Sequence, residues 1–214
     1  MELAKNIKTI LHSIPNTVQL VAATKYVEVE DMLKLLKEGI YHFGENRTDA
    51  FLKKYAQLKA YPIRWHFIGH LQTNKAKEVL PKLDVLHSLD SLKLAREIEK
   101  YREEVLPCFI EVNINGEQNK NGISPLECVA FIEELKKYPK VKVIGLMMMT
   151  TKLSTKEEKL RQFQSLAKLL EEINARLNMS LKELSMGMSE DYLEAIEANS
   201  TTIRLGRILW EIRN

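Results

Sequence analysis

Eight short apolar runs recur along the 214-residue chain, and their alternation with longer amphipathic stretches is the feature that most constrains its fold. The runs are QLVAAT, YHFG, RWHFIG, VLHSL, CFIEVNI, VIGLMMM, ELSMG and TTIRLG. Continuous apolar runs are typical of strands that are covered on both faces. Strands that alternate with helical patterns predict a parallel sheet.

The stretches between the runs have helical spacing. The stretch STKEEKLRQFQSLAKLLEEINARL carries one apolar stripe, which consists of Leu160, Phe163, Leu166, Leu169, Leu170 and Ile173. SPLECVAFIEELKKY begins with a serine cap and a first-turn proline, and its stripe consists of Leu126, Val129, Ile132 and Leu135. With one additional helix in front, eight such units predict a single domain over residues 1–214, a (β/α)8 TIM barrel with an extra N-terminal helix. An open, doubly wound sheet is the structural alternative.

Composition excludes several classes of function. The net charge is only +3, with 32 basic and 29 acidic residues interleaved, so we expect no nucleic-acid partner. Cys108 and Cys128 have no metal-ligand spacing, which favours a reduced, cytoplasmic protein without a metal site. No apolar run approaches the roughly 20 residues of a membrane helix, and the first residues lack the apolar core of a signal peptide. We therefore expect no membrane association.

Lys25 follows the first apolar run, although lysine is among the residues least often buried. Taken alone, a lysine that extends from a strand end to water is the simpler interpretation. The alternative is a Schiff-base lysine, because low dielectric and nearby positive charge leave a nucleophilic amine. Strand alternation places Lys25 on the same side as Val21 and Ala23, so its amine would point into the barrel mouth if that side faces the interior.

Arg204 lies in the last run, TTIRLG, where Ile203 and Leu205 form the apolar face. That face suits packing against helices. Because successive strand residues point to opposite faces, Arg204 is then expected to point into the barrel. A buried guanidinium without a partner is costly and cannot lose its proton, so something inside should accept its hydrogen bonds. A structural salt bridge to a barrel acid such as Glu111 is an equal alternative.

The last two loops, MGMSED and LGRILW, are where barrels often hold phosphate. Gly187 and Gly206 would allow close approach of the backbone to an anion. Ser189 stands where a helix N-cap would be, and its hydroxyl could serve the helix, an anion or both. Asn46, taken alone, is best interpreted as an N-cap, and Met147 as core packing.

A specific set of motifs covers residues 22–206. They are AATK, HFGEN, WHFIGHLQTNK, HSLD, NGEQNKNGI, GLM, LSMGMSEDYLEAI and IRLG. By these motifs the chain resembles the pyridoxal phosphate homeostasis protein family, whose members share the barrel of bacterial alanine racemase.

The resemblance implies that the cofactor is pyridoxal 5′-phosphate. The residues it assigns to cofactor binding are Lys25 (as the Schiff base), Asn46, Met147, Ser189, Arg204, Gly206 and Arg207. It implies that Arg204 faces the pyridine nitrogen and that Ser189 and Gly206 hold the phosphate. Arg207 stands where the family usually has a threonine, and we hypothesise that its guanidinium replaces the lost hydroxyl.

The same resemblance implies how the cofactor would be used. An arginine opposite the pyridine nitrogen opposes its protonation, so the ring is a weaker electron sink. The racemases add a tyrosine from a second domain, and none is expected here. We therefore expect a monomeric carrier or regulator in pyridoxal phosphate homeostasis, not an enzyme, with pyridoxal-phosphate-dependent apo-enzymes as candidate partners. A low-rate enzyme such as an amino-acid racemase is the alternative, and an interaction module without ligand is the third.

Overall fold

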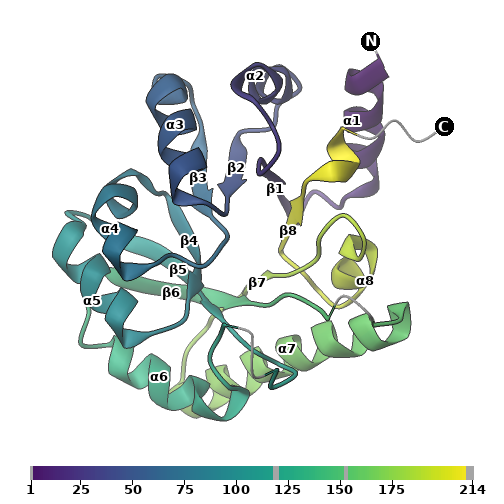
Figure 1. The fold of residues 1–214 in the computed structure, drawn as a ribbon. Helices are drawn as coiled ribbons and strands as arrows, with labels where there is room; N and C mark the ends of the chain where they lie inside the picture. Colours follow the sequence, from purple (N-terminus) through teal and green to yellow (C-terminus); the bar gives the residue numbers. More distant parts are fainter. Residues whose placement is uncertain (1, 118–120, 152–153, 211–214) are drawn as a thin grey trace.

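Eight parallel strands close into a barrel in the computed structural model, which describes residues 2–117, 121–151 and 154–210 (Figure 1). Each strand pairs with its sequence neighbours, and β1 closes the ring by pairing with β8. The strands are β1 (Gln19–Ala23), β2 (His42–Glu45), β3 (Arg64–Phe67), β4 (Val85–Leu89), β5 (Leu106–Glu111), β6 (Val141–Met147), β7 (Glu183–Ser185) and β8 (Thr202–Leu205). The predicted TIM barrel is confirmed, and the open-sheet alternative is wrong.

Helices surround the barrel. They are α1 (Glu2–Ser13), α2 (Val29–Lys37), α3 (Thr48–Leu58), α4 (Thr73–Val79), α5 (Leu92–Tyr101), α6 (Cys128–Leu135), α7 (Lys156–Leu177) and α8 (Tyr192–Glu197). Short 3-10 turns follow α4, precede α6 and follow β8, namely η1 (Leu80–Lys82), η2 (Pro125–Glu127) and η3 (Arg207–Leu209). Among the described residues, no helix has the length and apolar character to cross a membrane.

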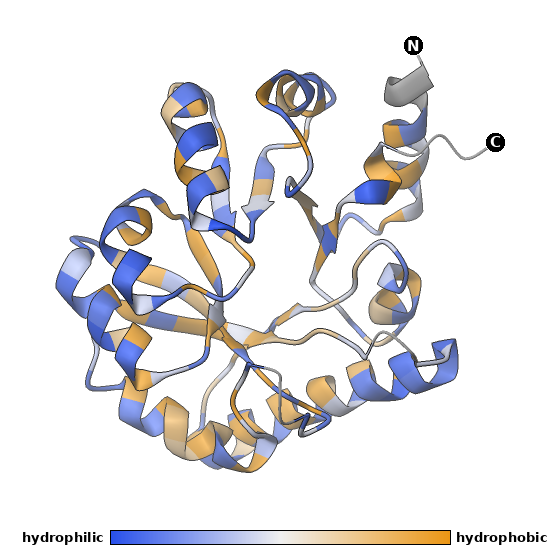
Figure 2. Ribbon diagram, viewed as in Figure 1, coloured by the Kyte–Doolittle hydropathy of each residue, from blue (hydrophilic) through white to orange (hydrophobic). Residues whose placement is uncertain are grey.

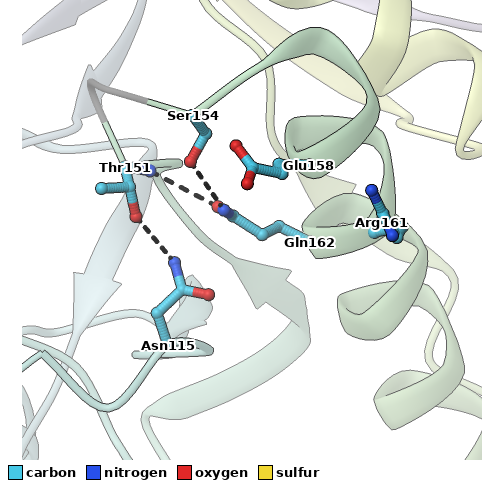
Figure 3. A pocket seen from close by; sticks show the side chains of 6 residues that line it. All are labelled: Asn115, Thr151, Ser154, Glu158, Arg161 and Gln162. Atoms are coloured by element: carbon cyan, nitrogen blue, oxygen red, sulfur yellow. Dashed lines mark hydrogen bonds between the residues drawn. The ribbon is translucent and has the colours of Figure 1, made fainter.

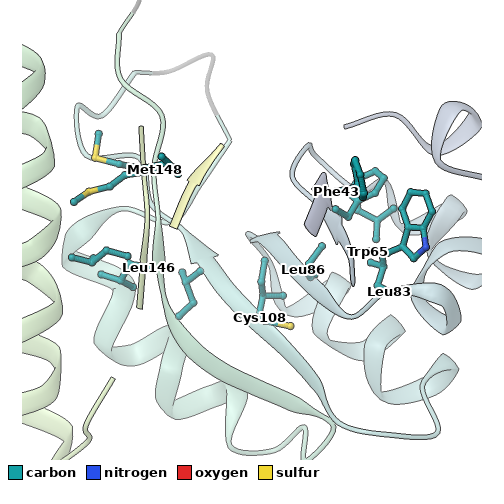
Figure 4. Close-up of a cluster of buried hydrophobic side chains, with 14 of the residues drawn as sticks. Phe43, Trp65, Leu83, Leu86, Cys108, Leu146 and Met148 are labelled. Carbon is teal, nitrogen blue, oxygen red and sulfur yellow. The ribbon is translucent and has the colours of Figure 1, made fainter. Parts of the chain in front are cut away.

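The main core lies between the barrel and its helices. The helices carry both hydrophilic and hydrophobic residues (Figure 2), and on α7 the buried side chains include Phe163, Leu166, Leu170 and Ile173. The predicted α7 stripe is therefore confirmed at its centre, with Leu160 and Leu169 only partly buried. Outward-facing strand residues supply the other half of this core, and Figure 4 shows side chains such as Phe43, Trp65, Leu86 and Leu146 packed in it.

The predicted start of α6 is wrong. Pro125 opens the 3-10 turn η2, and the α-helix begins three residues later at Cys128. Because 3.0 residues complete a 3-10 turn rather than 3.6, Leu126 leaves the α6 stripe and is 94% exposed. The Ser124 side chain makes no cap hydrogen bond, so the predicted serine cap is absent as well.

The extra N-terminal helix completes the ring of helices next to β8 (Figure 1). After β8 the described chain forms only the turn η3, and α1 packs on it: Asn6 Nδ2 donates to the Ile208 carbonyl at 3.0 Å and to the Leu209 carbonyl at 3.2 Å. On its other side, Lys8 Nζ lies 3.9 Å from Glu38 Oε2 at the end of α2. The predicted N-terminal helix is confirmed.

Candidate functional site

A cavity of about 860 Å³ opens at the carboxyl ends of β1 and β8. The predicted binding residues that line it are Lys25, Ser189, Arg204, Gly206 and Arg207. Arg204 belongs to β8, and the other four residues come from the loops after β1, β7 and β8. The barrel brings them together because parallel strands present all their carboxyl ends at one face.

Lys25 lies two residues beyond the end of β1, in a turn closed by the Val27 amide, which donates to the Thr24 carbonyl at 3.0 Å. Its side chain is exposed to the cavity, and its Nζ sits 4.8 Å from the centre of the Tyr26 ring. A hydrogen bond to Lys25 and its positive charge lower the pKa of the exposed Tyr26 phenol. The Lys25 amine and a phenol with a lowered pKa are therefore neighbours at the cavity wall.

A buried network fixes the residue before Lys25. The Thr24 hydroxyl donates to Glu45 Oε1 at 2.9 Å, and Lys54 Nζ donates to the Thr24 carbonyl at 2.5 Å. Lys54 also pairs with Glu45, and both side chains are buried. This network ties the start of the Lys25 turn to β2 and α3. The nine-residue separation of Glu45 and Lys54 follows no short-range spacing rule, so sequence reasoning missed it.

Arg204 points into the barrel, as predicted, and is 3% exposed. Its Nη1 donates to the Ser185 carbonyl at 2.8 Å and to Ser185 Oγ at 2.5 Å, and its Nη2 donates to the Met148 carbonyl at 2.9 Å. All of these acceptors are neutral. Burial lowers the pKa of Arg204 to about 10, against the opposing pull of Asp191 and Glu111, so the guanidinium stays charged at neutral pH.

The salt-bridge alternative for Arg204 is wrong, since the described residues include no carboxylate within ion-pair distance of it. Glu111 is buried, and one of its carboxylate oxygens has no hydrogen-bond partner among the described residues. Burial, followed by the charge of Asp90, raises the pKa of Glu111 to about 7. Arg204 is therefore a buried cation without a counter-charge in contact, which favours a ligand with hydrogen-bond acceptors.

The two last loops meet at Ser189. Its hydroxyl accepts the Gly206 amide at 3.2 Å, so it joins the loop after β7 to the loop after β8. The predicted N-cap role is wrong, because the N-cap position of α8 is Asp191. Gly187 has φ +94°, and a Cβ there would lie 2.6 Å from the Ala195 Cβ, so only glycine fits this close approach.

Two acidic residues, Glu190 and Asp191, line the same cavity next to Ser189. Asp191 is buried, and it accepts the Met188 amide and the Thr150 hydroxyl, each at 2.6 Å. Glu190 pairs with the exposed guanidinium of Arg207. Arg207 thus lies at the cavity, but any anion that it binds must compete with Glu190.

Asn46 and Met147 do not line this cavity. Asn46 follows β2, and the N-cap position of α3 is Arg47, so the predicted N-cap role of Asn46 is wrong. The Asn46 side-chain oxygen is buried without a partner among the described residues. Met147 is buried inside the barrel against Val85 and Phe109, as expected for core packing.

A second cavity, of about 500 Å³, lies between the loops after β5 and β6 and the start of α7 (Figure 3). Four of the residues that line it, Asn115, Thr151, Ser154 and Gln162, bond to one another in pairs. Asn115 Nδ2 donates to Thr151 Oγ1 at 3.0 Å, and Gln162 Nε2 donates to Ser154 Oγ at 3.0 Å. Gln162 Oε1 also accepts the Thr151 amide at 3.4 Å. These contacts hold the loops, and the groups are already satisfied.

Comparison with known proteins agrees with this geometry. The barrel with a lysine after β1 and an inward arginine on β8 is of the alanine racemase N-terminal domain class, and the profile of that family matches residues 1–214. Curated pyridoxal phosphate homeostasis proteins match most of the chain. The one from Aquifex aeolicus (strain VF5) is 39% identical over 198 residues, covering 91% of this chain and 87% of that protein. The chain belongs to the pyridoxal phosphate homeostasis protein family.

Solved structures extend the likeness to three dimensions. PipY of Synechococcus elongatus PCC7942, solved with pyridoxal phosphate bound, is 28% identical with a TM-score of 0.90, covering 98% of this chain and 100% of that one. An alanine racemase of Clostridium difficile 630 superposes with a TM-score of 0.81 at 16% identity, covering 98% of this chain and 56% of that one. The second comparison shows a shared fold only.

Proposed function

We propose that this protein binds pyridoxal 5′-phosphate in the cavity at the barrel mouth and serves as a carrier or regulator in the homeostasis of this cofactor. One observation carries the proposal: a lysine amine and a buried, uncompensated guanidinium open into the same cavity. A ligand with an aldehyde, a ring nitrogen and a phosphate matches these groups. We infer that residues 1–214 act as one cofactor-binding domain.

The residues of the cavity fit each part of the cofactor. Lys25 would hold the aldehyde carbon through its amine as a Schiff base, and Arg204 would donate to the ring nitrogen. Ser189, Gly206 and Arg207 would hold the phosphate, with Gly187 leaving room for the backbone. Asn46 and Met147 do not line the cavity, and their contact with the cofactor stays a prediction of the family resemblance.

The cofactor, when bound, supplies an electron sink for carbanions at the α-carbon of an amino acid. Arg204 keeps its proton at neutral pH and opposes a second positive charge on the ring nitrogen, which weakens that sink. The buried Thr24, Glu45 and Lys54 network holds the Lys25 turn in place. These features favour retention and release of the cofactor over rapid turnover.

Tyr26 supports catalysis as the second candidate function. Its phenol lines the cavity next to Lys25, and the Lys25 hydrogen bond lowers the pKa of this phenol. A lysine and a tyrosine could both act as acid or base on a substrate in this cavity. Exposure of Tyr26 to water limits how well it would be positioned.

The test starts with the visible spectrum of the purified protein, loaded with pyridoxal phosphate, before and after borohydride reduction. We expect an imine band that borohydride removes, and a tryptic peptide with the cofactor mass on Lys25. Deuterium exchange at the α-carbon of amino acids then separates the two candidates. Exchange at a rate typical of enzymes would contradict the carrier function.

We propose further that the protein acts as a cytoplasmic monomer and delivers its cofactor to apo-enzymes that depend on pyridoxal phosphate. Size-exclusion chromatography with light scattering checks the first point. Transfer from the loaded protein to an apo-enzyme, followed by recovery of that enzyme's activity in the presence of a scavenger of free cofactor, checks the second.

A further inference from the structure

A row of three histidines runs through the barrel interior and ends at Arg204. His42 Nδ1 lies 2.9 Å from His66 Nε2, and His66 Nδ1 lies 2.8 Å from His87 Nε2. His87 Nδ1 in turn lies 2.8 Å from Ser185 Oγ, which accepts Arg204 Nη1 at 2.5 Å. The row therefore crosses β2, β3, β4, β7 and β8 without a gap.

The two ends of the row open into different cavities. Arg204 lines the cavity of about 860 Å³ at the carboxyl ends of the strands. His42 is the first residue of β2, and it lines a separate cavity of about 410 Å³ at the amino-terminal end, beside Leu11 and Ile14. His66 and His87 are buried between them. The row thus connects the candidate cofactor cavity with the opposite face of the barrel.

All three imidazoles have a lowered pKa, which favours their neutral form. Burial lowers the pKa of His66 to about 3 and that of His87 well below its ordinary value, with the neighbouring imidazoles adding to both shifts and Arg204 to that of His87. Burial, followed by Arg64, also lowers the pKa of His42, and Asp84 opposes this shift. A neutral imidazole has one donor and one acceptor nitrogen, so the row has a direction.

Ser185 sets that direction. Its oxygen accepts from Arg204, and its hydroxyl hydrogen has His87 Nδ1 as the acceptor within reach. If Ser185 donates to His87, then His87 Nε2–H donates to His66 and His66 Nε2–H donates to His42. In the opposite direction the buried Ser185 hydrogen would lose this acceptor, which costs free energy. The geometry therefore favours the Nε2–H tautomer at all three histidines.

We propose that His42, His66 and His87 form a relay that positions Arg204 through Ser185 and couples cofactor retention to the protonation of His42. This inference rests on the proposed function, since Arg204 must contact the cofactor if the protonation of His42 is to change cofactor affinity. His42, His66 and His87 are positioning residues in this proposal, because none of them lines the cofactor cavity.

Protonation of His42 reverses the row. The His66 Nε2 hydrogen moves to His42 Nδ1, the His87 Nε2 hydrogen moves to His66 Nδ1, and the Ser185 hydroxyl hydrogen moves to His87 Nδ1. Ser185 Oγ regains one hydrogen from water, which supplies the net proton, so His42 carries hydrogen on both nitrogens and His66 and His87 each carry one, on Nδ1. Ser185 Oγ now accepts from His87, its own hydrogen has lost its acceptor, and the hold on Arg204 weakens.

The charged groups around the relay do not interrupt it. Arg64 and Asp84 face His42 and lie 3.8 Å from each other as an ion pair. Arg204 faces His87 at the other end, and Asp191 and Glu111 face Arg204. Within the described part of the chain, the residues that line the amino-terminal cavity include no charged side chain, so His42 is the titratable imidazole there, with its pKa lowered by burial.

The first test measures histidine tautomers by ring-nitrogen NMR in the cofactor-free protein. We expect the Nε2–H tautomer at His42, His66 and His87 at pH 7.5. As the pH is lowered through the titration of His42, His66 and His87 should change to Nδ1–H with the same midpoint. A mixture of tautomers along the row at pH 7.5, or independent midpoints, would overturn the relay.

The second test measures the affinity for pyridoxal phosphate by absorbance at pH 8 and at a pH below the midpoint of His42 found in the first test. His42→Gln keeps an acceptor for His66 but cannot take a proton, so it should lose less affinity at low pH than the wild type, by about fivefold. His12→Gln, which removes an exposed histidine on α1, should behave as the wild type. Equal pH dependence in wild type and His42→Gln would overturn the coupling. If the wild type binds no cofactor at any pH, the proposed function fails, and the tautomer measurement still decides the relay.

Discussion

The two cavities around the barrel mouth differ in how their polar groups are satisfied. Around Thr151 and Gln162, amide, hydroxyl and backbone groups bond to one another, and nothing in that set calls for a ligand. Around Arg204, a buried cation has only neutral acceptors, and the Lys25 amine opens into the cavity beside Tyr26. Polar side chains that hydrogen-bond to one another stabilise the loops that carry them. A buried charge without a counter-charge instead indicates a binding site.

Among the variants of the two cavities, replacement of Lys25 should reduce cofactor affinity most strongly. Lys25→Ala removes the amine that attaches the cofactor, so we expect an affinity loss of about a hundredfold or more, equal to about 2.7 kcal/mol. The imine band should disappear completely. Lys75→Ala is the matched control, since Lys75 is an exposed lysine 3.9 Å from Glu78 and surface pairs contribute little. Retention of the band in Lys25→Ala would rule out this lysine as the attachment point.

Arg204→Gln should have the second largest effect. The amide can still donate to one of the neutral acceptors, but the charge facing the ring nitrogen is lost. A hydrogen bond to a charged group contributes about 2 kcal/mol, so we expect the affinity to fall about thirtyfold. Equilibrium dialysis measures the affinity, and urea unfolding checks that the variant is folded. Unchanged affinity in a folded variant would contradict the role of Arg204.

Ser189→Ala should have a smaller effect on the same cavity. It removes one neutral hydrogen-bond partner of the phosphate and the acceptor for the Gly206 amide. We expect an affinity loss of about fivefold, close to 1 kcal/mol. Ser165→Ala on the exposed side of α7 is the control. If both variants bind equally well, the phosphate lies elsewhere.

Thr151→Val tests the second cavity, whose polar groups bond to one another. The valine leaves Asn115 and Glu117 without the threonine hydroxyl, so the free energy of unfolding should fall by about 1 kcal/mol. Cofactor affinity should not change, because the groups of this cavity already bond to one another. An affinity loss as large as that of Ser189→Ala would show that the second cavity also takes part in binding.

Much of the site could be predicted because its residues stand next to strand ends. Lys25, Ser189, Arg204 and Gly206 each follow or belong to a strand whose apolar run is visible, and parallel strands bring such positions to one face. The partners of these residues could not be predicted. Arg204 was expected to meet Glu111 as an equal alternative, but the register of β8 against β1 and β7 gives it Ser185 and Met148 instead.

Helix starts were the least predictable local feature. Ser124, Asn46 and Ser189 all have residue types that favour N-caps, yet none of them caps a helix through its side chain. In each case the α-helix begins one to three residues later than the residue type suggests. Tertiary contacts decide such ends, because the cap hydrogen bond is weak relative to burial of the neighbouring loop.

By itself the sequence determined the barrel, its eight strands and the identity of the lysine and arginine at its mouth, because hydrophobic period and residue type are local properties. Only the tertiary structure decided which polar groups meet. His42, His66 and His87 lie on three different strands, and the distances between them depend on strand register and on the inward face of each strand. The sequence carries no signal for such contacts, since residues 21 to 24 positions apart become neighbours only when the barrel closes.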